Sequence, residues 1–313
     1  MADRVTAFAP ASIGNLAVGF DMLGLALDGV GDRVEARRTD GDAIMIDAVF
    51  GLDGEPHPYL PTDVGSNTAS IAAQSFWQAH GDQGGAALTI RKGVPLQSGM
   101  GSSAASAVAA VVAVNGLLDE PLPAARLLMY ALEGEKFASG GLHADNVAPS
   151  LLGGMVLCPE SLLPDTVRLA VPDGISAVLL HPELQVNTAQ ARKHLLRSVS
   201  VPLWLEQQGY LAAFIAACAA NDHALIARTL RDVVIEPQRA EAVSCFEAVR
   251  DAAMRGGAAG CSLSGSGPSI FALVTSAHAS NVATSMEQAC RAMGIDCQSW
   301  VSSMSAPGAR VED

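Results

Sequence analysis

The chain has 313 residues, half of them apolar, with 19 Lys and Arg against 32 Asp and Glu. Its length exceeds the size at which one hydrophobic core usually divides, so we expect two domains. The net charge of −13 argues against a nucleic-acid or anionic-membrane surface, and the longest apolar runs are far shorter than the ~20 residues that cross a bilayer.

The first part of the chain is predicted to be rich in strands. Alternating or β-branched patterns predict strands over residues 5–9, 34–38, 43–49 and 87–91. Helical periodicity follows over residues 67–80, 104–114 and 124–137, and strands are expected at 154–157 and 175–181.

The second part of the chain shifts toward helix. Periodicity predicts helices over residues 188–197, 201–219, 223–232, 239–255 and 280–293, with strands over 269–275 and 296–302. This order is typical of an α+β domain. We expect the boundary near residues 159–172, which gives domains 1–165 and 166–313.

The cysteines and the first residues indicate the compartment. The six Cys show neither a CxxC pair nor a His-linked metal spacing. Residues 1–11 lack the apolar region of a signal peptide. We therefore expect a cytoplasmic protein without nucleic-acid or membrane partners.

Residues 95–105, reading PLQSGMGSSAA, join a glycine loop to a helix of small residues. Gly99 and Gly101 allow backbone dihedrals in which consecutive amide N–H groups turn toward one anion. Ser102 and Ser103 lie where the helix begins, and the unpaired N–H groups and positive dipole end of that helix favour the same anion. The loop therefore predicts a polyphosphate site.

Three other interpretations of this loop compete with a polyphosphate site. A Walker A loop needs a Lys directly before its Ser or Thr, and residues 95–105 contain no Lys. A dinucleotide fingerprint matches Gly99, Gly101 and Ala104, but Pro95 separates the loop from the preceding strand and Asp119 lies in a turn. A plain glycine cap on a buried helix is the structural alternative.

Three motifs together resemble the galactokinase, homoserine kinase, mevalonate kinase and phosphomevalonate kinase (GHMP) superfamily. They are PASIGNLAVGFDMLGLAL at residues 10–27, the loop at 95–105, and GAAGCSLSGSGPSIFAL at 257–273. Within the superfamily, HADNVAP at 143–149, TAQAR at 188–192 and EPQR at 236–239 are most similar to the homoserine kinases. The resemblance covers residue 10 to about residue 273.

The resemblance implies a two-domain α+β GHMP-kinase fold, with a strand-rich N-terminal ATP-binding domain and a ferredoxin-like α+β C-terminal domain. The implied reaction is ATP-dependent phosphorylation of the side-chain hydroxyl of L-homoserine to O-phospho-L-homoserine, in threonine biosynthesis. ATP is then the co-substrate, Mg²⁺ the metal and a homodimer the expected assembly. Another small-molecule kinase of the superfamily and a catalytically silent nucleotide-binding relative stay open as alternatives.

The resemblance also implies a substrate pocket. Asn15 and Asp21 would take the ammonium group, and Arg192 and Arg239 the carboxylate. Asn146 would face the hydroxyl, and Asp145 stays an open candidate for a catalytic base, since some superfamily members use an Asp in this segment. The complete substrate-binding set is Asn15, Asp21, His143, Asn146, Thr188, Arg192 and Arg239.

Taken singly, several of these residues have ordinary structural explanations. Asp21 and Asn146 could each close a turn, and Arg192 could belong to a solvated helix face.

The nucleotide side is implied in the same way. Asn67 would meet the base and is also a good helix N-cap. Ser103 and Glu135 would supply oxygen ligands for Mg²⁺. The complete ATP-binding set is Asn67, Pro95, Leu96, Gln97, Ser98, Gly99, Met100, Gly101, Ser102, Ser103, Ala104 and Ala105.

Overall fold

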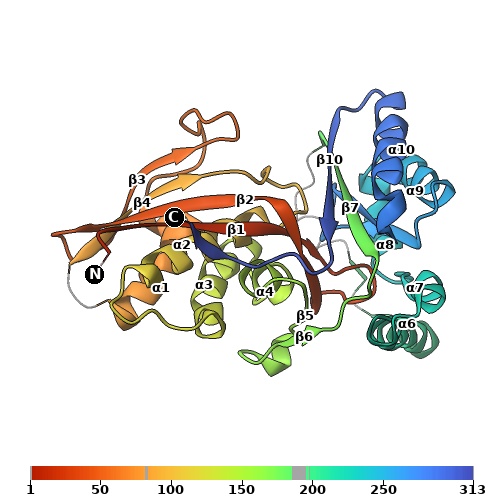
Figure 1. The fold of residues 1–313 in the computed structure, drawn as a ribbon, viewed down its shortest axis with the longest axis horizontal. Coiled ribbons are helices and arrows are strands. Elements are labelled where there is room, and N and C mark those ends of the chain that lie inside the picture. The colour runs from red at the N-terminus through yellow and green to blue at the C-terminus, as the bar shows by residue number, and fades with distance from the viewer. Residues whose placement is uncertain (1, 82–83, 185–194, 197, 313) are drawn as a thin grey trace.

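The computed structural model describes residues 2–81, 84–184, 195–196 and 198–312, and it contains two β-sheets with helices packed against them (Figure 1). The expected α+β class is confirmed. No helix in the described ranges is long and apolar enough to cross a membrane. The cytoplasmic location stays a prediction.

The first sheet carries the N-terminal half of the chain. Its strands run in the order β11-β1-β2-β4-β3, and β5 pairs with both β2 and β6. All of its pairs are antiparallel except β3 with β4. The strands are β1 (Arg4–Gly14), β2 (Leu23–Thr39), β3 (Ile44–Phe50), β4 (Gly85–Arg91), β5 (Met155–Leu157), β6 (Val167–Leu169) and β11 (Arg310–Glu312).

Four helices cover one face of this sheet (Figure 1). They are α1 (Thr68–His80), α2 (Ser102–Gly116), α3 (Leu128–Ser139) and α4 (Ala144–Leu152). The central one, α2, is built from Ala, Val and Ser, and it packs against β1, β2, α1 and α3 at once. Residues on every side of α2 are buried, which explains why it has no polar face. The surrounding core therefore fixes the position of its N-terminus.

The second sheet is antiparallel, in the order β10-β7-β9-β8. Its strands are β7 (Ile175–Pro182), β8 (Gly260–Leu263), β9 (Ile270–Thr275) and β10 (Cys297–Ser303). Its helices are α6 (Val201–Ala220), α7 (His223–Thr229), α8 (Glu236–Arg239), α9 (Phe246–Arg255) and α10 (Ala279–Ala292).

Alternate residues of β7 face two different cores. Ala177 and Leu179 lie in a cluster with Phe214 of α6, and this cluster continues into the first sheet through Leu25. Val178 and the other alternate residues lie in a second cluster with α9 and α10. Because side chains alternate along a strand, one face of β7 packs toward the first sheet and the other face packs against α9 and α10.

Short 3₁₀ helices connect several of these elements. They are Val64–Ser66, Ala124–Leu127, Glu160–Leu162, Ala240–Ala242 and Ser276–His278.

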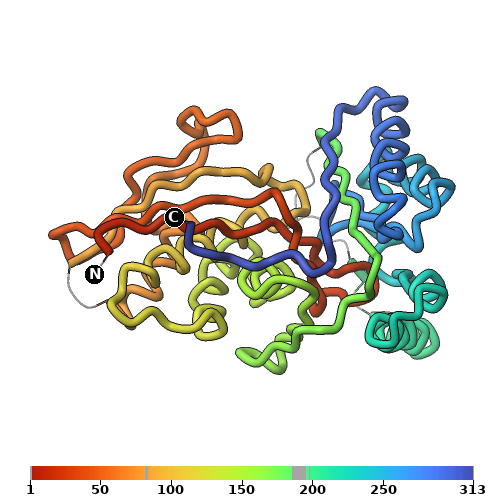
Figure 2. The backbone as a smooth tube through the Cα atoms, in the orientation of Figure 1, coloured from red at the N-terminus to blue at the C-terminus, as the bar shows by residue number. Residues whose placement is uncertain are grey.

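The chain end returns to the first sheet. Strand β11 pairs with β1, so the C-terminus lies over the sheet that begins the chain (Figure 2). Strand β6 also pairs in this sheet, although it lies beyond residue 165. The domain boundary at residue 165 stays a prediction, and these two strands are the segments that cross it.

Most expected elements are present. Strands β6, β8 and β11 were not expected, and three further elements differ from their expected form. The helix expected over 239–255 is instead α8, a 3₁₀ turn and α9. Helix α4 was not expected, because Pro149 in its interior resembles a helix end. Strand β2 begins at Leu23, well before the expected residue 34. The helix expected at 188–197 lies almost wholly outside the described residues.

Candidate active site

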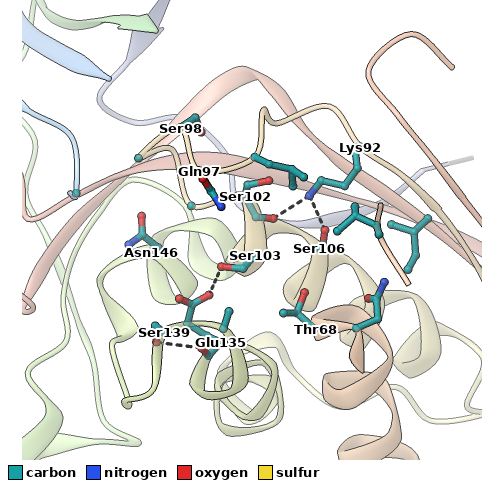
Figure 3. A pocket seen from close by; sticks show the side chains of 18 of the residues that line it. Thr68, Lys92, Gln97, Ser98, Ser102, Ser103, Ser106, Glu135, Ser139 and Asn146 are labelled. Atoms are coloured by element: carbon teal, nitrogen blue, oxygen red, sulfur yellow. Dashed lines mark hydrogen bonds between the residues drawn. The ribbon is translucent and has the colours of Figure 1, made fainter. Parts of the chain in front are cut away.

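A cavity of about 480 Å³ lies at the N-terminus of α2 (Figure 3). Its polar lining includes Ser102, Ser103, Glu135 and Asn146, which come from α2, α3 and α4. Its apolar lining includes Leu60, Pro61 and Ile90. The cavity thus combines a polar end of a buried helix with an apolar wall.

The glycine loop bends around this cavity in left-handed backbone conformations. Gln97, Gly99 and Gly101 have φ values of 53°, 76° and 69°. A Cβ on Gly99 would lie 2.5 Å from the Ser264 carbonyl oxygen, and a Cβ on Gly101 would lie 2.5 Å from Ser12 Oγ. Glycine is therefore required at 99 and 101 both for dihedral angle and for space. The helix that follows directs its N-terminal dipole at the cavity.

Eleven of the twelve predicted ATP-binding residues divide into two groups, and the twelfth, Pro95, is partly exposed and does not line the cavity. Residues that line the cavity are Asn67, Leu96, Gln97, Ser98, Gly99, Gly101, Ser102 and Ser103. Met100, Ala104 and Ala105 are fully buried in the core behind the loop. They support the loop from behind, while the binding roles themselves stay predictions.

Asn67 caps helix α1 at the edge of the cavity. Its Oδ1 accepts a hydrogen bond from the Ala69 amide at 3.0 Å, and its Nδ2 donates to the Pro61 carbonyl at 3.0 Å. The side chain therefore ties the apolar wall to the start of α1. The expected helix-capping role of Asn67 is confirmed, and its contact with a base stays a prediction.

Ser103 and Glu135 lie next to each other in the wall of the cavity. Ser103 Oγ donates a hydrogen bond to Glu135 Oε2 at 2.6 Å. The pKa of Glu135 is raised to about 7, mainly by burial; the Ser103 hydrogen bond opposes this shift, and the nearby negative charge of Asp145 adds to it. A buried carboxylate that is costly to ionise is a suitable neighbour for a cation.

This pair fits Mg²⁺. Mg²⁺ prefers hard oxygen ligands and is commonly held by one or two carboxylates together with phosphate oxygens and water. In the part of the chain that the structure describes, no three His, Cys, Asp or Glu side chains gather to form a larger metal site. Ser103 and Glu135 are two adjacent oxygen-bearing side chains that line the cavity beside the glycine loop.

The segment after β1 forms a turn of left-handed residues beside the cavity. Asn15, Leu16 and Ala17 have φ values of 66°, 43° and 60°. Such consecutive conformations are costly and persist only where the surroundings hold them. The Asn15 amide donates to Asp145 Oδ2 at 3.2 Å, and Asn15 Oδ1 accepts from the Asp21 amide at 3.0 Å. The structure thus brings Asn15, Asp21 and Asp145 together.

His143 and Asn146 approach this turn from α4. His143 Nδ1 lies 3.7 Å from Asp21 Oδ2. Asn146 Oδ1 accepts a hydrogen bond from Ser12 Oγ at 2.9 Å, and its side chain borders Gly101 closely enough that a Cβ there would lie 3.0 Å from Oδ1. Asn146 therefore lies between the end of β1 and the glycine loop, and Figure 3 shows it at the cavity.

Arg239 reaches the same place from the second sheet. Its Nη1 donates to the Gly265 carbonyl at 2.8 Å, and Asn15 Nδ2 donates to the same oxygen at 3.0 Å. Its guanidinium carbon lies 5.2 Å from the centre of the Phe20 ring. Arg239 and Asn15 thus share one carbonyl acceptor, and their substrate-binding roles stay predictions, whereas Thr188 and Arg192 lie outside the described residues.

The late SGSGPS segment at residues 264–269 docks on the glycine loop. Ser264 Oγ donates to the Gly99 carbonyl at 2.6 Å, and the Ser269 amide donates to the Ser98 carbonyl at 3.1 Å. Gly265 and Ser266 also line the cavity. A loop of the second sheet therefore closes a site built on the first.

Sequence reasoning missed Asp32, Lys92 and Ser106. Lys92 lines the cavity, and the three side chains form one buried group. Lys92 lies three residues before Pro95, the first residue of the glycine loop. Asp32 gave no signal, because nothing in a single strand sequence shows which residue it faces 60 positions later.

Comparison with known proteins agrees with this geometry. The family profile described as "GHMP kinases N terminal domain" matches residues 67–154, and the one described as "GHMP kinases C terminal" matches residues 214–292.

Curated relatives match this chain over nearly its full length. A homoserine kinase of Xylella fastidiosa (strain M12) is 44% identical over 312 residues, covering 99% of this chain and 94% of the relative. One from Xanthomonas campestris pv. campestris (strain B100) is 43% identical, covering 97% and 93%. The crystal structure of a homoserine kinase from Cytophaga hutchinsonii superposes with a TM-score of 0.94 at 40% identity, covering 100% of this chain and 98% of the other.

Proposed function

The chain belongs to the homoserine kinases of the GHMP kinase superfamily, and from that premise we propose that its cavity binds ATP beside L-homoserine and transfers the γ-phosphoryl group to the side-chain hydroxyl. The products are ADP and O-phospho-L-homoserine. This is the step in threonine biosynthesis that the sequence resemblance implies.

The position of Asn146 carries the proposal. Its side chain borders Gly101 of the glycine loop on one side and accepts from Ser12 of the first motif on the other. It also lines the cavity that contains Ser103 and Glu135. An acceptor hydroxyl held by Asn146 would therefore lie next to a phosphate held by the loop.

The glycine loop and the N-terminus of α2 are assigned to the phosphates of ATP. Their amide groups and the helix dipole supply fixed positive potential, which suits a polyphosphate without requiring a free Lys or Arg. Leu60, Pro61 and Asn67 line the cavity and are assigned to the base. Four further residues are assigned to the shape of the loop, since they do not line the cavity: Pro95, Met100, Ala104 and Ala105.

Ser103 and Glu135 are assigned to Mg²⁺. Bound there, the ion supplies neutralisation of the charge on the phosphate oxygens during transfer. Their 2.6 Å hydrogen bond shows that both oxygens reach one point of the cavity.

The amino-acid part of homoserine is assigned to the left-handed turn and to Arg239. The Asp21 carboxylate offers a partner for the ammonium group, with His143 beside it. Arg239 offers a planar donor for the carboxylate. Asn15 joins the two, because it bonds both the Asp21 amide and the carbonyl that Arg239 contacts. Thr188 and Arg192 complete this pocket as predictions.

The transfer step needs little acid–base chemistry. A loose, metaphosphate-like transition state asks mainly for alignment of the hydroxyl with the phosphate, and Asn146 is assigned to that alignment. Asp145 accepts a hydrogen bond from the Asn15 amide and thereby stabilises the left-handed turn. Its role as a base stays a prediction.

We also propose a homodimer in which α6 faces α6 of a second copy. Helix α6 is apolar for most of its length, yet only Phe214, Ala217 and Cys218 of it are buried. Val201 is 66% exposed and Leu205 is 56% exposed on its outer side. With a net charge of −13, two copies meet most easily through a nearly uncharged face.

Release of ADP by the purified protein with Mg²⁺ and ATP tests the function. L-homoserine is compared with D-homoserine, L-serine, mevalonate and galactose as acceptors. We expect turnover with L-homoserine alone. Turnover with mevalonate or galactose instead would keep the kinase fold but discard the pocket. Nucleotide binding without ADP release from any acceptor would favour the catalytically silent relative.

A further inference from the structure

Three buried polar side chains lie directly behind the glycine loop. Asp32 comes from β2, Lys92 follows β4, and Ser106 belongs to the second turn of α2. The side chain of Asp32 is fully buried and that of Lys92 is 3% exposed. Figure 3 shows Lys92 and Ser106 meeting at the wall of the cavity. We call these three residues the loop clasp.

The Asp32 carboxylate joins the chain before the loop to the helix after it. Its Oδ1 accepts the amides of Gly93 at 2.8 Å and Val94 at 3.0 Å. Its Oδ2 accepts Ser106 Oγ at 2.6 Å and also binds the Lys92 ammonium. One buried carboxylate therefore contacts both ends of the segment that forms the predicted phosphate site.

The Lys92 ammonium, which is positively charged, also joins the chain before the loop to helix α2. It donates to Asp32, to the Ser102 carbonyl at 3.0 Å and to Ser106 Oγ at 2.7 Å. An ammonium has three N–H donors, and these contacts use all three. Lys92 is thus directed into the protein although it lines the cavity, and it is not arranged as a direct phosphate ligand.

Further contacts close the two ends of the loop. Ser102 Oγ donates to the Val94 carbonyl at 2.9 Å. A Cβ on Gly93 would lie 2.0 Å from the Gly31 carbonyl oxygen, so the backbone beside Asp32 is in close contact with β2. The chain between Val94 and Ser102 is therefore held at both ends by the same group of atoms.

Stability alone does not account for such a pair. Two charges lose their hydration on burial, and replacement of a buried ion pair by apolar residues is often neutral or stabilising. Its benefit here is geometric, because the left-handed residues between the ends need their surroundings to hold them. Held ends keep the loop amides directed at one point before a phosphate arrives.

We propose that the loop clasp holds the glycine loop in its nucleotide-binding conformation, so that Asp32 and Lys92 are positioning residues for ATP. This inference rests on the proposed assignment of ATP to the cavity. The hydrogen bonds described above for Asn15, Asp21 and Arg239 go to residues outside the clasp, so we expect its effect to fall on the nucleotide.

The affinity for ADP with Mg²⁺, measured by titration calorimetry, tests the clasp in Asp32→Asn and Lys92→Met. Both changes keep side-chain size while removing one charge. We expect ADP to bind about tenfold or more weakly, as for loss of a hydrogen bond to a charged group. KM for ATP should rise accordingly, with KM for L-homoserine within about twofold of the parent.

Arg37→Met is the matched control, because Arg37 also lies on β2 and forms an ion pair, with Asp47, but does not line the cavity. It should leave ADP affinity unchanged. A clasp that served stability alone would lower the melting temperature of Asp32→Asn without changing ADP affinity of the folded protein, and that result would overturn the inference.

If Asp32→Asn and Lys92→Met do not fold, Ser106→Ala tests the clasp instead. It removes one hydroxyl from the clasp, and we expect ADP to bind a few-fold more weakly. Unchanged affinity in folded Ser106→Ala would overturn the inference. Failure of the substrate assignment is separate, because the parent protein would then still bind ADP while leaving L-homoserine unphosphorylated.

Discussion

At the residue scale, Asp21 is the clearest candidate for discrimination among acceptors. Its carboxylate lies beside His143, and its amide is fixed by Asn15. Of the acceptors compared above, mevalonate and galactose have no ammonium for this carboxylate to meet.

Asp21→Asn should therefore raise KM for L-homoserine by about tenfold or more, since hydrogen bonds to charged groups contribute about 1.5–3 kcal/mol. Steady-state kinetics and ADP calorimetry measure the two substrates separately, and ADP affinity should not change. Asp28→Asn, an exposed carboxylate whose Oδ1 accepts the Gly29 amide, is the control. Equal KM values for Asp21→Asn and the parent would refute the ammonium assignment.

Glu135 gives the fold a pH dependence in the absence of metal. Its pKa is 4.5 in the unfolded chain and about 7 in the folded protein, because burial disfavours the charge. The unfolded chain therefore releases this proton first as pH rises. The contribution of Glu135 to the free energy of unfolding falls between these pKa values and stays low above them.

Glu135→Gln should remove this dependence. In metal chelator, the variant should match the parent near pH 4 and exceed its free energy of unfolding at pH 8 by on the order of 3 kcal/mol. Urea unfolding at several pH values measures the difference. Glu133→Gln, on the exposed side of the same helix, should show no such trend. Parallel curves for the parent and Glu135→Gln would contradict the burial argument.

At the scale of the element, the glycine loop depends on space as much as on dihedral angle. Gly99 has φ 76°, and an added Cβ would lie 2.5 Å from one backbone oxygen and 2.7 Å from another. Both oxygens belong to the late loop of the second sheet, which cannot shift without leaving the site.

Gly99→Ala should weaken ADP binding by about tenfold or more, because strain of order 1–3 kcal/mol is added to the bound geometry. Calorimetry with ADP and Mg²⁺ measures it. Gly29→Ala is the matched control, since Gly29 has φ 78° but open space around its Cβ position. If both variants bind ADP alike, the contact with the late loop does not constrain the site.

Sequence alone predicts the elements whose pattern is local. Helix α2 was expected, since its run of small apolar residues follows a glycine loop and fits a fully buried helix. The break between α8 and α9 was not expected, because the helical pattern of the sequence continues through the 3₁₀ turn that separates them. Helix α4 was also missed, because its interior Pro149 resembles a helix end. In the structure Pro149 and the backbone of α4 pack closely against Gly24 of β2.

The site shows the same division. The glycine loop was identified from its own residues, and Asn146 and the pair of Ser103 and Glu135 from the family resemblance; all of them lie around one cavity. Asp32 was not, because its partners are set by the pairing of β2 with β4. Contacts across a sheet carry no local signal in one sequence.

At the scale of the whole molecule, the site lies where the two sheets meet. The first sheet and its helices supply the glycine loop, Asn146 and the proposed metal ligands Ser103 and Glu135. The second supplies Arg239 and the late loop that contacts Ser98 and Gly99. Neither sheet alone contains the pocket, so displacement of one relative to the other would separate the nucleotide from its acceptor.

The exposed face of α6 predicts assembly at this scale. Light scattering should give twice the mass of one chain, and Leu205→Glu should shift the protein toward the monomer by placing like charges in the contact. Leu52→Glu, at a residue 60% exposed on another part of the molecule, should leave the mass unchanged. A parent protein that is monomeric throughout the concentration range would refute the dimer.

The most direct measurement of the central claim is identification of the product by phosphorus NMR, with ADP quantified in the same reaction. The account predicts one O-phospho-L-homoserine, esterified at the side-chain hydroxyl, for each ADP formed. It also predicts that Asn146→Ala lowers kcat by about a hundredfold while ADP affinity is retained. ADP formation without phosphohomoserine, or an unchanged kcat in Asn146→Ala, would contradict it.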